Sequence, residues 1–509
     1  MWVRFLPGAP TIVKNKLKID LPAVEAGIPK TVRQVSLVLS RAGFENFLIG
    51  GCVRDLLIGR EPKDWDITTK ATPEQIQSLF PHTFYENEYG TVGVVNDDEK
   101  NESLKTIEVT PYRIESGYSD MRHPDKVEWG ETVEQDLARR DFTMNAIAYE
   151  IENDRIVDPF GGVDDIKKKL IRTVGKPEER FGEDALRMLR ALRFSAELGF
   201  VIETETLSAI EKNAELLGHI SKERIRDEFI KMVMSDSPAF AFDSAVRLGL
   251  MPYIAPEFEK GVGVEQNQAH AYTVWEHLLR SLEHAGKKGF PLHVRLTALF
   301  HDIAKPHTKK WLNNQWTFYG HEVVGAKLTR NTLTDLKFSK EIIEKVTKLV
   351  RWHMFFSDTE EISLSAVRRM VRNVGPELIW DLMNVRSADR IGTGRPKESP
   401  YRLRKYHSMI EEVMRDPISV KQLKVSGEDI MKLTGTSGGP HIGFILEILL
   451  SEVLEDSTRN TKDYLENRVN ELHTLPPKEL ETLGKEARKQ NESEDEKEVE
   501  KIKGKHGVR

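Results

Sequence analysis

The sequence has a single cysteine, Cys52, in 509 residues. One cysteine excludes an intrachain disulfide and a zinc site built from several thiolates, so the chain fits a reducing compartment. No run of about 18 apolar residues occurs, and Pro7 interrupts the short apolar start of the chain. We therefore expect neither a membrane-spanning helix nor a secretory signal peptide, and we predict a cytoplasmic protein without a membrane partner.

An excess of basic residues is also missing. Lysine and arginine together number 75 against 81 acidic residues, which gives a formal net charge of −6. A protein of this charge has no global attraction for nucleic acid, so any surface for RNA must be a local patch. The hydrophobic content of 39% and the charged content of 31% are typical of a globular protein, and the length predicts three or four domains.

The most informative stretch is an apolar run, a glycine pair and an acidic pair within about twenty residues. Residues 47–49 predict a strand that runs into Gly50 and Gly51, a turn without side chains that a phosphate can approach closely. Asp64 and Asp66 follow, and residues two apart in a strand share a face. Two such carboxylates suit Mg²⁺, which binds through carboxylates and substrate phosphates. Each feature alone is commonplace, but the combination favours nucleotidyl transfer.

This stretch resembles the signature of class II tRNA nucleotidyltransferases and bacterial poly(A) polymerases, which belong to the polymerase-β-like nucleotidyltransferases. The resemblance covers about residues 30–260, with its motifs in the family's order. It implies that Asp64 and Asp66 hold two catalytic Mg²⁺ ions, one lowering the pKa of the attacking 3′-hydroxyl and one stabilising the pyrophosphate. It also implies that the nucleotide triphosphate is held by Gly50, Gly51, Arg54 and Asp55.

A third carboxylate, Glu108, is a candidate ligand beside the aspartate pair. It lies in an alternating run over residues 106–110 that predicts a strand, and polymerase-like sites often take a third carboxylate from a neighbouring strand. A structural or solvent-facing role for Glu108 fits equally well. Residues 111–130 lack periodicity and predict a loop. In the resembling family this loop helps to switch from C to A addition, and its full length here favours complete CCA addition.

The segment over residues 136–146 combines arginines with a polar pair. Arg139 and Arg140 can engage phosphates as bidentate donors. Asp141 and Asn145 are one helical turn apart and could hydrogen-bond a ribose. In isolation the segment would more simply be a polar helix start, but it resembles the family's ribose-selecting motif.

A helix is predicted over residues 180–194, and it would place Asp184 and Arg187 on one face. Most such pairs are surface ion pairs of little energetic value. The stretch also resembles the family's Glu-Asp-X-X-Arg motif, which implies that this pair selects CTP and ATP by imitating a Watson–Crick edge. Arg190 and Arg193 continue the basic stripe.

The surrounding residues carry a local positive charge that fits a path for an RNA 3′ end. Residues 161–193 contain nine Lys/Arg and six Asp/Glu, a local charge of +3. Residues 221–229 resemble the last family motif, whose arginine supports the neighbouring template helix. A purely structural role for this segment and a contact with nucleotide fit equally well.

A second constellation, of histidines and aspartates, is distributed over residues 265–395. A lone histidine on a helix is usually a packed core residue, but several histidines with aspartates suit Mn, Ni, Fe, Zn or Mg. The pattern resembles an HD-superfamily phosphohydrolase domain. The resemblance implies four metal ligands, with two further histidines binding a second metal or contacting phosphate. The four are His277, His301, Asp302 and Asp389, and the two are His321 and His353.

Domains of this kind fused to such transferases are linked to phosphatase and 2′,3′-cyclic phosphodiesterase activity, which would repair a damaged RNA 3′ end. An inactive scaffold that only shapes RNA binding is the alternative.

We predict an α+β protein: a polymerase-β-like head with a mixed sheet and helices, followed by an all-helical neck, body and HD domain. The expected boundaries are an irregular lead-in over 1–30, the nucleotidyltransferase head over 31–160, a helical neck and body with nucleotide-selecting and RNA-binding helices over 161–260, the HD domain over 265–400, a helical RNA-contacting region over 401–480 and a charged, disordered tail over 484–509.

The predicted function is template-independent addition of CCA to tRNA 3′ ends from CTP and ATP, with Mg²⁺ in the head and a divalent metal such as Mg, Mn or Ni in the HD domain. A poly(A) polymerase, or an enzyme that adds only CC or only A, uses the same motifs. An HD phosphohydrolase with a head that only binds nucleotide or RNA is an alternative of another class, and a non-catalytic RNA-binding module is a third. The intact Asp64 and Asp66 pair argues against the HD alternative, and the presence of two metal-binding constellations argues against the non-catalytic module. The sequence leaves the oligomeric state open, and a homo-oligomer is compatible with it.

Overall fold

The computed structural model describes residues 21–85, 90–97, 99–116, 126–266, 271–312, 314–354 and 362–490. The lead-in before residue 21, the centre of the predicted loop over 111–130 and the tail from residue 491 lie outside the described residues. The chain forms two compact units. The first comprises Met1–Glu259 with Asp335–Phe338, and the second comprises Lys260–Thr334 with Ser339–Arg509.

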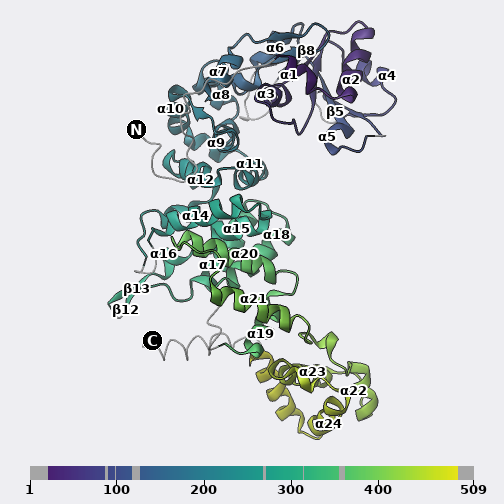
Figure 1. Ribbon diagram of the computed structural model, residues 1–509, viewed down its shortest axis with the longest axis vertical. Coiled ribbons are helices and arrows are strands. Elements are labelled where there is room, and N and C mark those ends of the chain that lie inside the picture. The colour runs from purple at the N-terminus through teal and green to yellow at the C-terminus, as the bar shows by residue number, and fades with distance from the viewer. Residues whose placement is uncertain are drawn as a thin grey trace. The chain divides into compact units, whose positions relative to one another are not determined.

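A seven-stranded mixed sheet forms the head (Figure 1). Its order is β3-β4-β5-β2-β1-β8-β9, and only β2 and β5 are parallel, so a long connection, which here contains α4, β3, β4 and α5, joins them. Residues 47–49 of β1 are almost fully buried, as expected for a central strand covered on both faces. The strands are β1 (Asn46–Ile49), β2 (Asp66–Thr69), β3 (Thr83–Tyr85), β4 (Val92–Val95), β5 (Thr106–Pro111), β8 (Ala148–Glu150) and β9 (Arg155–Val157).

Helices surround this sheet. Helix α2 buries Val32, Val35 and Leu39 on one face. Helix α4 begins at a capping box of Thr72 and Gln75, with Pro73 in its first turn. The helices of the head are α1 (Leu21–Ala26), α2 (Lys30–Arg41), α3 (Gly51–Leu57), α4 (Pro73–Leu79), α5 (Glu102–Lys105), α6 (Val133–Ala138), α7 (Gly162–Lys168) and the 3₁₀ turn η1 (Thr143–Asn145).

The prediction of a loop over residues 111–130 is wrong at both of its ends. Strand β6 (Arg113–Ser116) pairs antiparallel with β7 (Lys126–Trp129) and forms a two-stranded ribbon. Periodicity failed to reveal these strands because an isolated ribbon buries no continuous apolar face, so its sequence need not alternate.

The rest of the first unit is helical. It contains α8 (Pro177–Glu183), α9 (Leu186–Leu198), α10 (Thr204–Lys212), α11 (Lys222–Met234), α12 (Pro238–Arg247) and α13 (Met251–Ile254). A short parallel pair, β10 (Leu170–Ile171) with β11 (Val201–Ile202), interrupts the predicted all-helical region. The predicted helix over 180–194 is split, because Asp184 has an extended backbone between α8 and α9.

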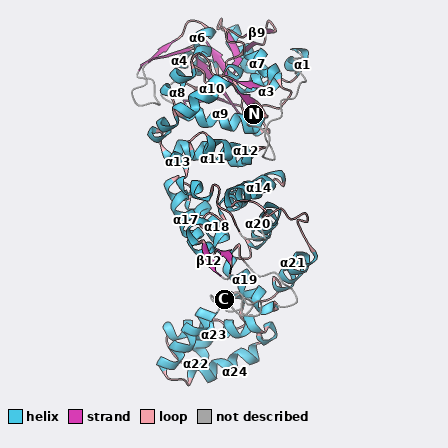
Figure 2. Cartoon of the chain, turned by 90° about the vertical axis from the view of Figure 1, so that its left-hand side faces the viewer, coloured by secondary structure: helices cyan, strands magenta, loops and turns pink. Residues whose placement is uncertain are grey.

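The second unit is also mostly helical, and in Figure 2 its strands are confined to one hairpin. This hairpin is β12 (Lys310–Leu312) with β13 (Gln315–Thr317). The helices are α14 (Val274–Lys287), α15 (Leu292–Phe300), α16 (Lys305–Thr308), α17 (His321–Asp335), α18 (Lys340–Trp352), α19 (Leu364–Val374), α20 (Ile379–Gly392), α21 (Tyr401–Val413), α22 (Gly427–Thr434), α23 (Pro440–Glu455) and α24 (Lys462–His473). One apolar core extends from α18 to α24.

Candidate functional sites

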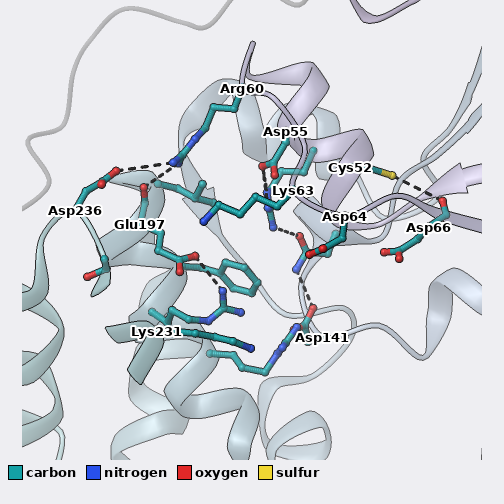
Figure 3. A pocket seen from close by; sticks show the side chains of 18 of the residues that line it. Cys52, Asp55, Arg60, Lys63, Asp64, Asp66, Asp141, Glu197, Lys231 and Asp236 are labelled. Carbon is teal, nitrogen blue, oxygen red and sulfur yellow. Dashed lines mark hydrogen bonds and ion pairs between the residues drawn. The ribbon is translucent and has the colours of Figure 1, made fainter. Parts of the chain in front are cut away.

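The head cleft is a hollow of about 570 Å³ that brings most of the predicted transferase residues together (Figure 3). Its walls come from α3, the turn before β2, η1 and the helices α9 and α11. The predicted residues that line it are Gly51, Arg54, Asp55, Asp64, Asp66, Arg140, Asp141, Asn145, Arg190 and Arg193. The predicted residues Gly50, Glu108, Arg139, Asp184 and Arg187 are not among the described lining residues.

Two features favour glycine at Gly50. Its φ of +77° lies in the left-handed region that side chains disfavour. A Cβ atom there would also collide with Nη1 of Arg140, and it would lie 3.7 Å from Oδ2 of Asp66. The glycine turn, the Arg140 guanidinium and the Asp66 carboxylate therefore lie against one another, which suits a triphosphate held beside a divalent cation.

The two predicted catalytic aspartates differ in their setting. Asp66 is the first residue of β2 and is half-buried, whereas Asp64 is exposed in a bend before the strand. The expectation that both stand on one strand is therefore wrong, although both line the cleft. Asp66 is the register partner of Glu108 on the parallel strand β5. This register fits a third carboxylate beside the pair.

A hydrogen-bonded chain links three elements of the cleft. Nη1 of Arg54 donates to Oδ1 of Asn145 at 2.8 Å, and Nδ2 of Asn145 donates to Oδ1 of Asp141 at 3.1 Å. Nε of Arg190 donates to Oδ2 of Asp141 at 2.7 Å. Burial alone would raise the pKa of Asp141, but the Arg190 charge and these hydrogen bonds outweigh it and lower the pKa to about 2. Asp141 is thus an ionised acceptor that holds Asn145 and Arg190 in place.

Asp184 and Arg187 do not pair through their side chains. The Asp184 carboxylate accepts the backbone N–H of Leu186, which starts α9 in the manner of a helix cap and accounts for the break from α8. Both carboxylate oxygens also accept from Arg224, at 3.2 and 2.8 Å. Arg187 instead donates to Glu183, at 2.6 Å. Each predicted selector is therefore held by a different charged partner.

Several charged residues near the head cleft were not predicted from the sequence. Glu228, 3% exposed, accepts from Arg193 at 2.7 Å and joins α11 to α9. Arg60 donates to the carbonyl of Glu197, at 2.9 Å, and pairs with Asp236 at the cleft (Figure 3). Glu228 and Arg60 are charged residues in segments that resemble the family's motifs, and this was the available signal. Their partners are far away in sequence, so residue spacing could not identify the pairs.

In the second unit, the predicted HD residues form one buried constellation, here called the HD centre. None of its residues is more than 7% exposed. Their ligand atoms form two triads, and within each triad the atoms lie within 4.8 Å of one another. The first triad is His277, His301 and Asp389, and the second is Asp302, His321 and His353.

Asp302 bridges the two triads. Its Oδ2 lies 3.1 Å from Nε2 of His277 and 3.4 Å from Nε2 of His301. Its Oδ1 lies 3.1 Å from Nε2 of His321 and 3.6 Å from Nε2 of His353. One carboxylate therefore faces two groups of imidazole nitrogens, an arrangement that fits two neighbouring divalent cations.

The imidazoles are oriented by the backbone. Nδ1 of His301 lies 3.0 Å from the carbonyl of Ala298, and Nδ1 of His321 lies 2.7 Å from that of Phe318. His353 has the same arrangement with the carbonyl of a residue three positions earlier, at 2.7 Å. A proton held on Nδ1 leaves the Nε2 lone pair for a metal ion. The donor set therefore fits the predicted metal centre.

Two cations at the HD centre were not predicted. Nζ of Lys305 lies 2.6 Å from Oδ2 of Asp302, and Arg386 donates to Oδ2 of Asp389. Burial would raise the pKa of both aspartates, but Lys305 and the histidines hold the pKa of Asp302 well below its usual value, and Arg386 does so for Asp389. Each cation is three residues from its aspartate, a helical spacing that could have revealed it.

Small residues allow the helices of the HD centre to approach closely. Ala285 of α14, Ala298 of α15 and Ala388 of α20 meet in one buried cluster. A Cβ atom at Gly392 would collide with Oγ of Ser281 and lie 3.0 Å from Nδ1 of His277. Close packing of α14 against α20 is what brings His277 to Asp389, so the ligands converge because these positions are small.

Family models match three consecutive segments of the chain. Residues 46–172 match the poly A polymerase head domain, residues 199–261 match the probable RNA and SrmB-binding site of polymerase A, and residues 268–390 match the HD domain. The described residues include no helix that is both long and apolar enough to cross a membrane.

Curated relatives and solved structures agree with these matches. A CCA-adding enzyme of Geobacillus sp. (strain WCH70) is 34% identical over 430 residues, which cover 84% of this chain and 92% of that protein. One from Limosilactobacillus reuteri (strain DSM 20016) is 32% identical over 461 residues, covering 89% and 98%.

The crystal structure of the Bacillus stearothermophilus CCA-adding enzyme in complex with CTP superposes with a TM-score of 0.66 at 28% identity, covering 87% of this chain and 98% of that one. The Thermotoga maritima CCA-adding enzyme complexed with tRNA_CCA shares the fold, with a TM-score of 0.55 at 18% identity over 89% of this chain and all of that one. Both comparisons confirm the predicted head with a mixed sheet followed by mostly helical domains. The chain therefore belongs to the family of class II CCA-adding enzymes and poly(A) polymerases, and it carries an HD domain.

Proposed function

We propose that this protein adds CCA to tRNA 3′ ends from CTP and ATP without a nucleic-acid template. The observation that carries the proposal is the head cleft, where a glycine turn, an arginine and two aspartates adjoin the Asp141 network. The CCA-adding enzymes that cover most of the chain supply the substrate class, since one of them binds CTP and another binds tRNA. The tRNA substrate and the single cysteine fit a cytoplasmic protein.

In the proposed mechanism Asp64 and Asp66 hold Mg²⁺, with Glu108 as a third carboxylate. Bound Mg²⁺ would supply positive charge for attack of the RNA 3′-hydroxyl on the α-phosphate and for departure of pyrophosphate. Arg54 and Arg140 bind the triphosphate. Arg139 lies outside the cleft and donates to the buried Asp136, at 2.8 Å, so its contribution is to hold the start of this motif.

The remaining residues of the head are assigned to the sugar and the base. Asp141 and Asn145 bind the ribose, and Arg190 and Arg193 complete the wall of the site. Asp184 and Arg187 select the base, as the family resemblance implies. Their partners Arg224 and Glu183 act as positioning residues, because a charged hydrogen bond restricts each selector to a small range of orientations.

Primer extension tests this function. Transcripts of tRNA ending at the discriminator base, at C and at CC are incubated with CTP, with ATP and with both. Extension of all three to one CCA end is expected. A halt at CC identifies a CC-adding enzyme, and activity on the CC-ended transcript alone identifies an A-adding one. A long A ladder identifies a poly(A) polymerase. No extension by folded protein supplied with Mg²⁺ leaves the HD centre as the only candidate catalytic site.

A second function is favoured by the bridging geometry of Asp302. The HD centre is proposed to hydrolyse phosphate esters at RNA 3′ ends, including 2′,3′-cyclic phosphates. His277, His301 and Asp389 would hold one divalent ion, His321 and His353 would hold another, and Asp302 would contact both. Such ions would supply Lewis-acid stabilisation of a phosphoryl oxygen and activate water.

The identity of the metal is tested by loading the protein with Mg²⁺, Mn²⁺, Ni²⁺, Fe²⁺ or Zn²⁺ and following hydrolysis of bis-p-nitrophenyl phosphate and of 2′,3′-cyclic AMP. About two bound ions per chain and activity with at least one metal are expected. Bound metal without hydrolysis would instead make the HD centre a structural site.

A further inference from the structure

Exposed apolar side chains recur on the chain segments that flank His321 and His353 of the HD centre. Sixteen large apolar side chains are exposed in the described part of the chain, and six of them lie on segments adjoining His321 and His353. Scattered exposed apolar residues are normal, but a concentration of this kind indicates a binding surface. The six are Trp311, Leu312, Tyr319, Val323, Val324 and Met354.

The β12–β13 hairpin carries the aromatic part of this group. Trp311 faces Trp316 across the two strands, and their rings meet edge to face with centroids 4.9 Å apart. Trp311 is nevertheless 55% exposed. Figure 1 shows the hairpin projecting from the helices beside α16. Trp311 is therefore presented to solvent on a two-stranded arm, with the half-buried indole of Trp316 packed against it.

Basic groups accompany the indoles. Nζ of Lys309 lies 4.3 Å from the ring centroid of Trp316 and donates to the carbonyl of Glu265, so its position is determined. The next residue, Lys310, is exposed on β12. Positive charge beside aromatic rings is the combination that binds single-stranded nucleic acid, in which bases stack and phosphates are neutralised.

The hairpin leads directly to the HD centre. The carbonyl of Phe318, the residue after β13, accepts from Nδ1 of the ligand His321. The ring of Phe318 lies 5.6 Å from Nζ of Lys305, the cation that contacts Asp302. Trp316 is two residues before Phe318, or about 7 Å along a strand. This backbone separation between Trp316 and Phe318 is about the length of one nucleotide in an extended RNA strand.

Stabilisation of the hairpin alone does not account for this arrangement. Cross-strand aromatic pairing stabilises a short hairpin, and that would explain the contact of Trp311 with Trp316. It would not explain the exposure of Trp311 and Tyr319 or the adjoining lysines. A protein-binding face is disfavoured, because lysine is depleted at the centres of such interfaces.

We propose that the β12–β13 hairpin is a stacking platform for the single-stranded 3′ end of RNA, with Trp311 and Trp316 contacting bases and Lys309 and Lys310 contacting the backbone, so that the terminal phosphate enters the HD centre. The proposal rests on the proposed phosphohydrolase function of that centre. It adds a binding site for the polymer that is separate from the ligands of the metal.

The test compares two substrates of the full-length, metal-loaded protein. Trp311→Ala should raise the KM for a single-stranded RNA with a 2′,3′-cyclic phosphate end about tenfold and leave kcat unchanged. Hydrolysis of bis-p-nitrophenyl phosphate should not change, because that substrate has no base to stack. Trp311→Phe should retain most RNA binding. Trp380→Ala is the matched control, since Trp380 is exposed on α20 of the same unit. Melting curves would show that the variants are folded.

Photocrosslinking gives a readout that does not require hydrolysis. RNA with 4-thiouridine at the penultimate position should crosslink to Trp311 or Trp316, and the crosslink should be lost in Trp311→Ala. Crosslinks only to the head, or an unchanged KM in Trp311→Ala, would overturn the proposal. A variant that dissociates an oligomer without affecting RNA would assign the hairpin to self-association and would also overturn it. If wild-type protein hydrolyses neither substrate, the HD function fails and the crosslink alone decides the platform.

Discussion

The head cleft and the HD centre both gather carboxylates for divalent ions, but they do so in opposite ways. Asp64 is exposed and Asp66 half-buried in an open cleft, whereas the six HD residues are buried and already converge within each triad. Water weakens the repulsion between exposed carboxylates. Asp64 and Asp66 can therefore remain in the cleft without a cation until a nucleotide binds with Mg²⁺. Buried carboxylates need neighbouring cations permanently, and Lys305 and Arg386 provide them.

This difference has a consequence for mutations. The carboxylates of Asp64 and Asp66 contribute to the reaction and little to folding, because water can replace them at small cost. An HD carboxylate contributes to both, because its removal changes the charge balance of a buried site.

Removal of Asp66 is expected to have the largest effect on activity. Asp66→Ala should lower CCA addition by more than about 10³-fold, because the metal-binding carboxylate at the cleft is lost. The melting temperature should change little. Asp97→Ala, at an exposed aspartate of the same unit, is the control. Retained activity in Asp66→Ala would refute the assignment, and a large loss of stability would remove the contrast with the HD centre.

Removal of Asp302 should affect activity and stability together. Asp302→Ala should abolish phosphate-ester hydrolysis and reduce the bound metal, as measured by elemental analysis. It should also destabilise the second unit by about 3–5 kcal/mol, because the buried Lys305 ammonium loses its carboxylate. Calorimetry measures this change, and CCA addition by the same sample should persist. Full metal content in Asp302→Ala would show that it does not bridge two ions.

Removal of Arg386 should affect the HD centre alone. Arg386 orients Asp389, and loss of such a partner typically lowers metal affinity or activity by about 10–100-fold. Arg386→Gln should therefore weaken metal binding in a chelator titration, with CCA addition unchanged. Arg372→Gln, at an arginine that pairs with Glu447, is the control. Equal effects of the two variants would mean that Arg386 acts only through general stability.

Loss of Arg224 should change nucleotide selection. Arg224→Ala frees the Asp184 carboxylate, so discrimination among the four nucleoside triphosphates should fall about tenfold, which corresponds to one lost charge-assisted hydrogen bond. Single-nucleotide incorporation assays measure the ratio of kcat/KM values. Arg226→Ala, two residues away on α11, should leave that ratio unchanged. A uniform fall for all nucleotides in Arg224→Ala would indicate a structural role only.

The smallest effect is a pH dependence of stability in the head. The pKa of Asp141 is lowered to about 2 in the folded protein, so its ionised form stabilises the fold above the unfolded pKa of about 4. The stability difference between wild type and Asp141→Asn should therefore be constant from pH 8 to pH 5 and should shrink below about pH 4. Thermal melting of both proteins measures it. A difference that varies between pH 8 and pH 5 would assign the effect to another group.

Much of the head and of the HD centre was predictable from local patterns. The glycine turn, the alternation around Glu108 and the residue types of the HD ligands can all be recognised along the chain because they reflect short-range backbone and metal-ligand chemistry. The loop predicted over 111–130 was wrong at both of its ends, and the continuous helix predicted over 180–194 was wrong. In both places the deciding contacts were hydrogen bonds that a periodicity pattern does not contain.

The sequence by itself determined which chemical groups the protein has: two aspartates after a glycine turn, arginines in the family's order, and histidines and aspartates suited to divalent metals. Only the tertiary structure decided which of these groups meet. The sheet register placed Glu108 beside Asp66, the packing of small residues brought α14 to α20, and Asp302 came to face both triads. The reason is physical: backbone propensity acts over a few residues, whereas long-range pairs depend on packing that only the whole fold provides.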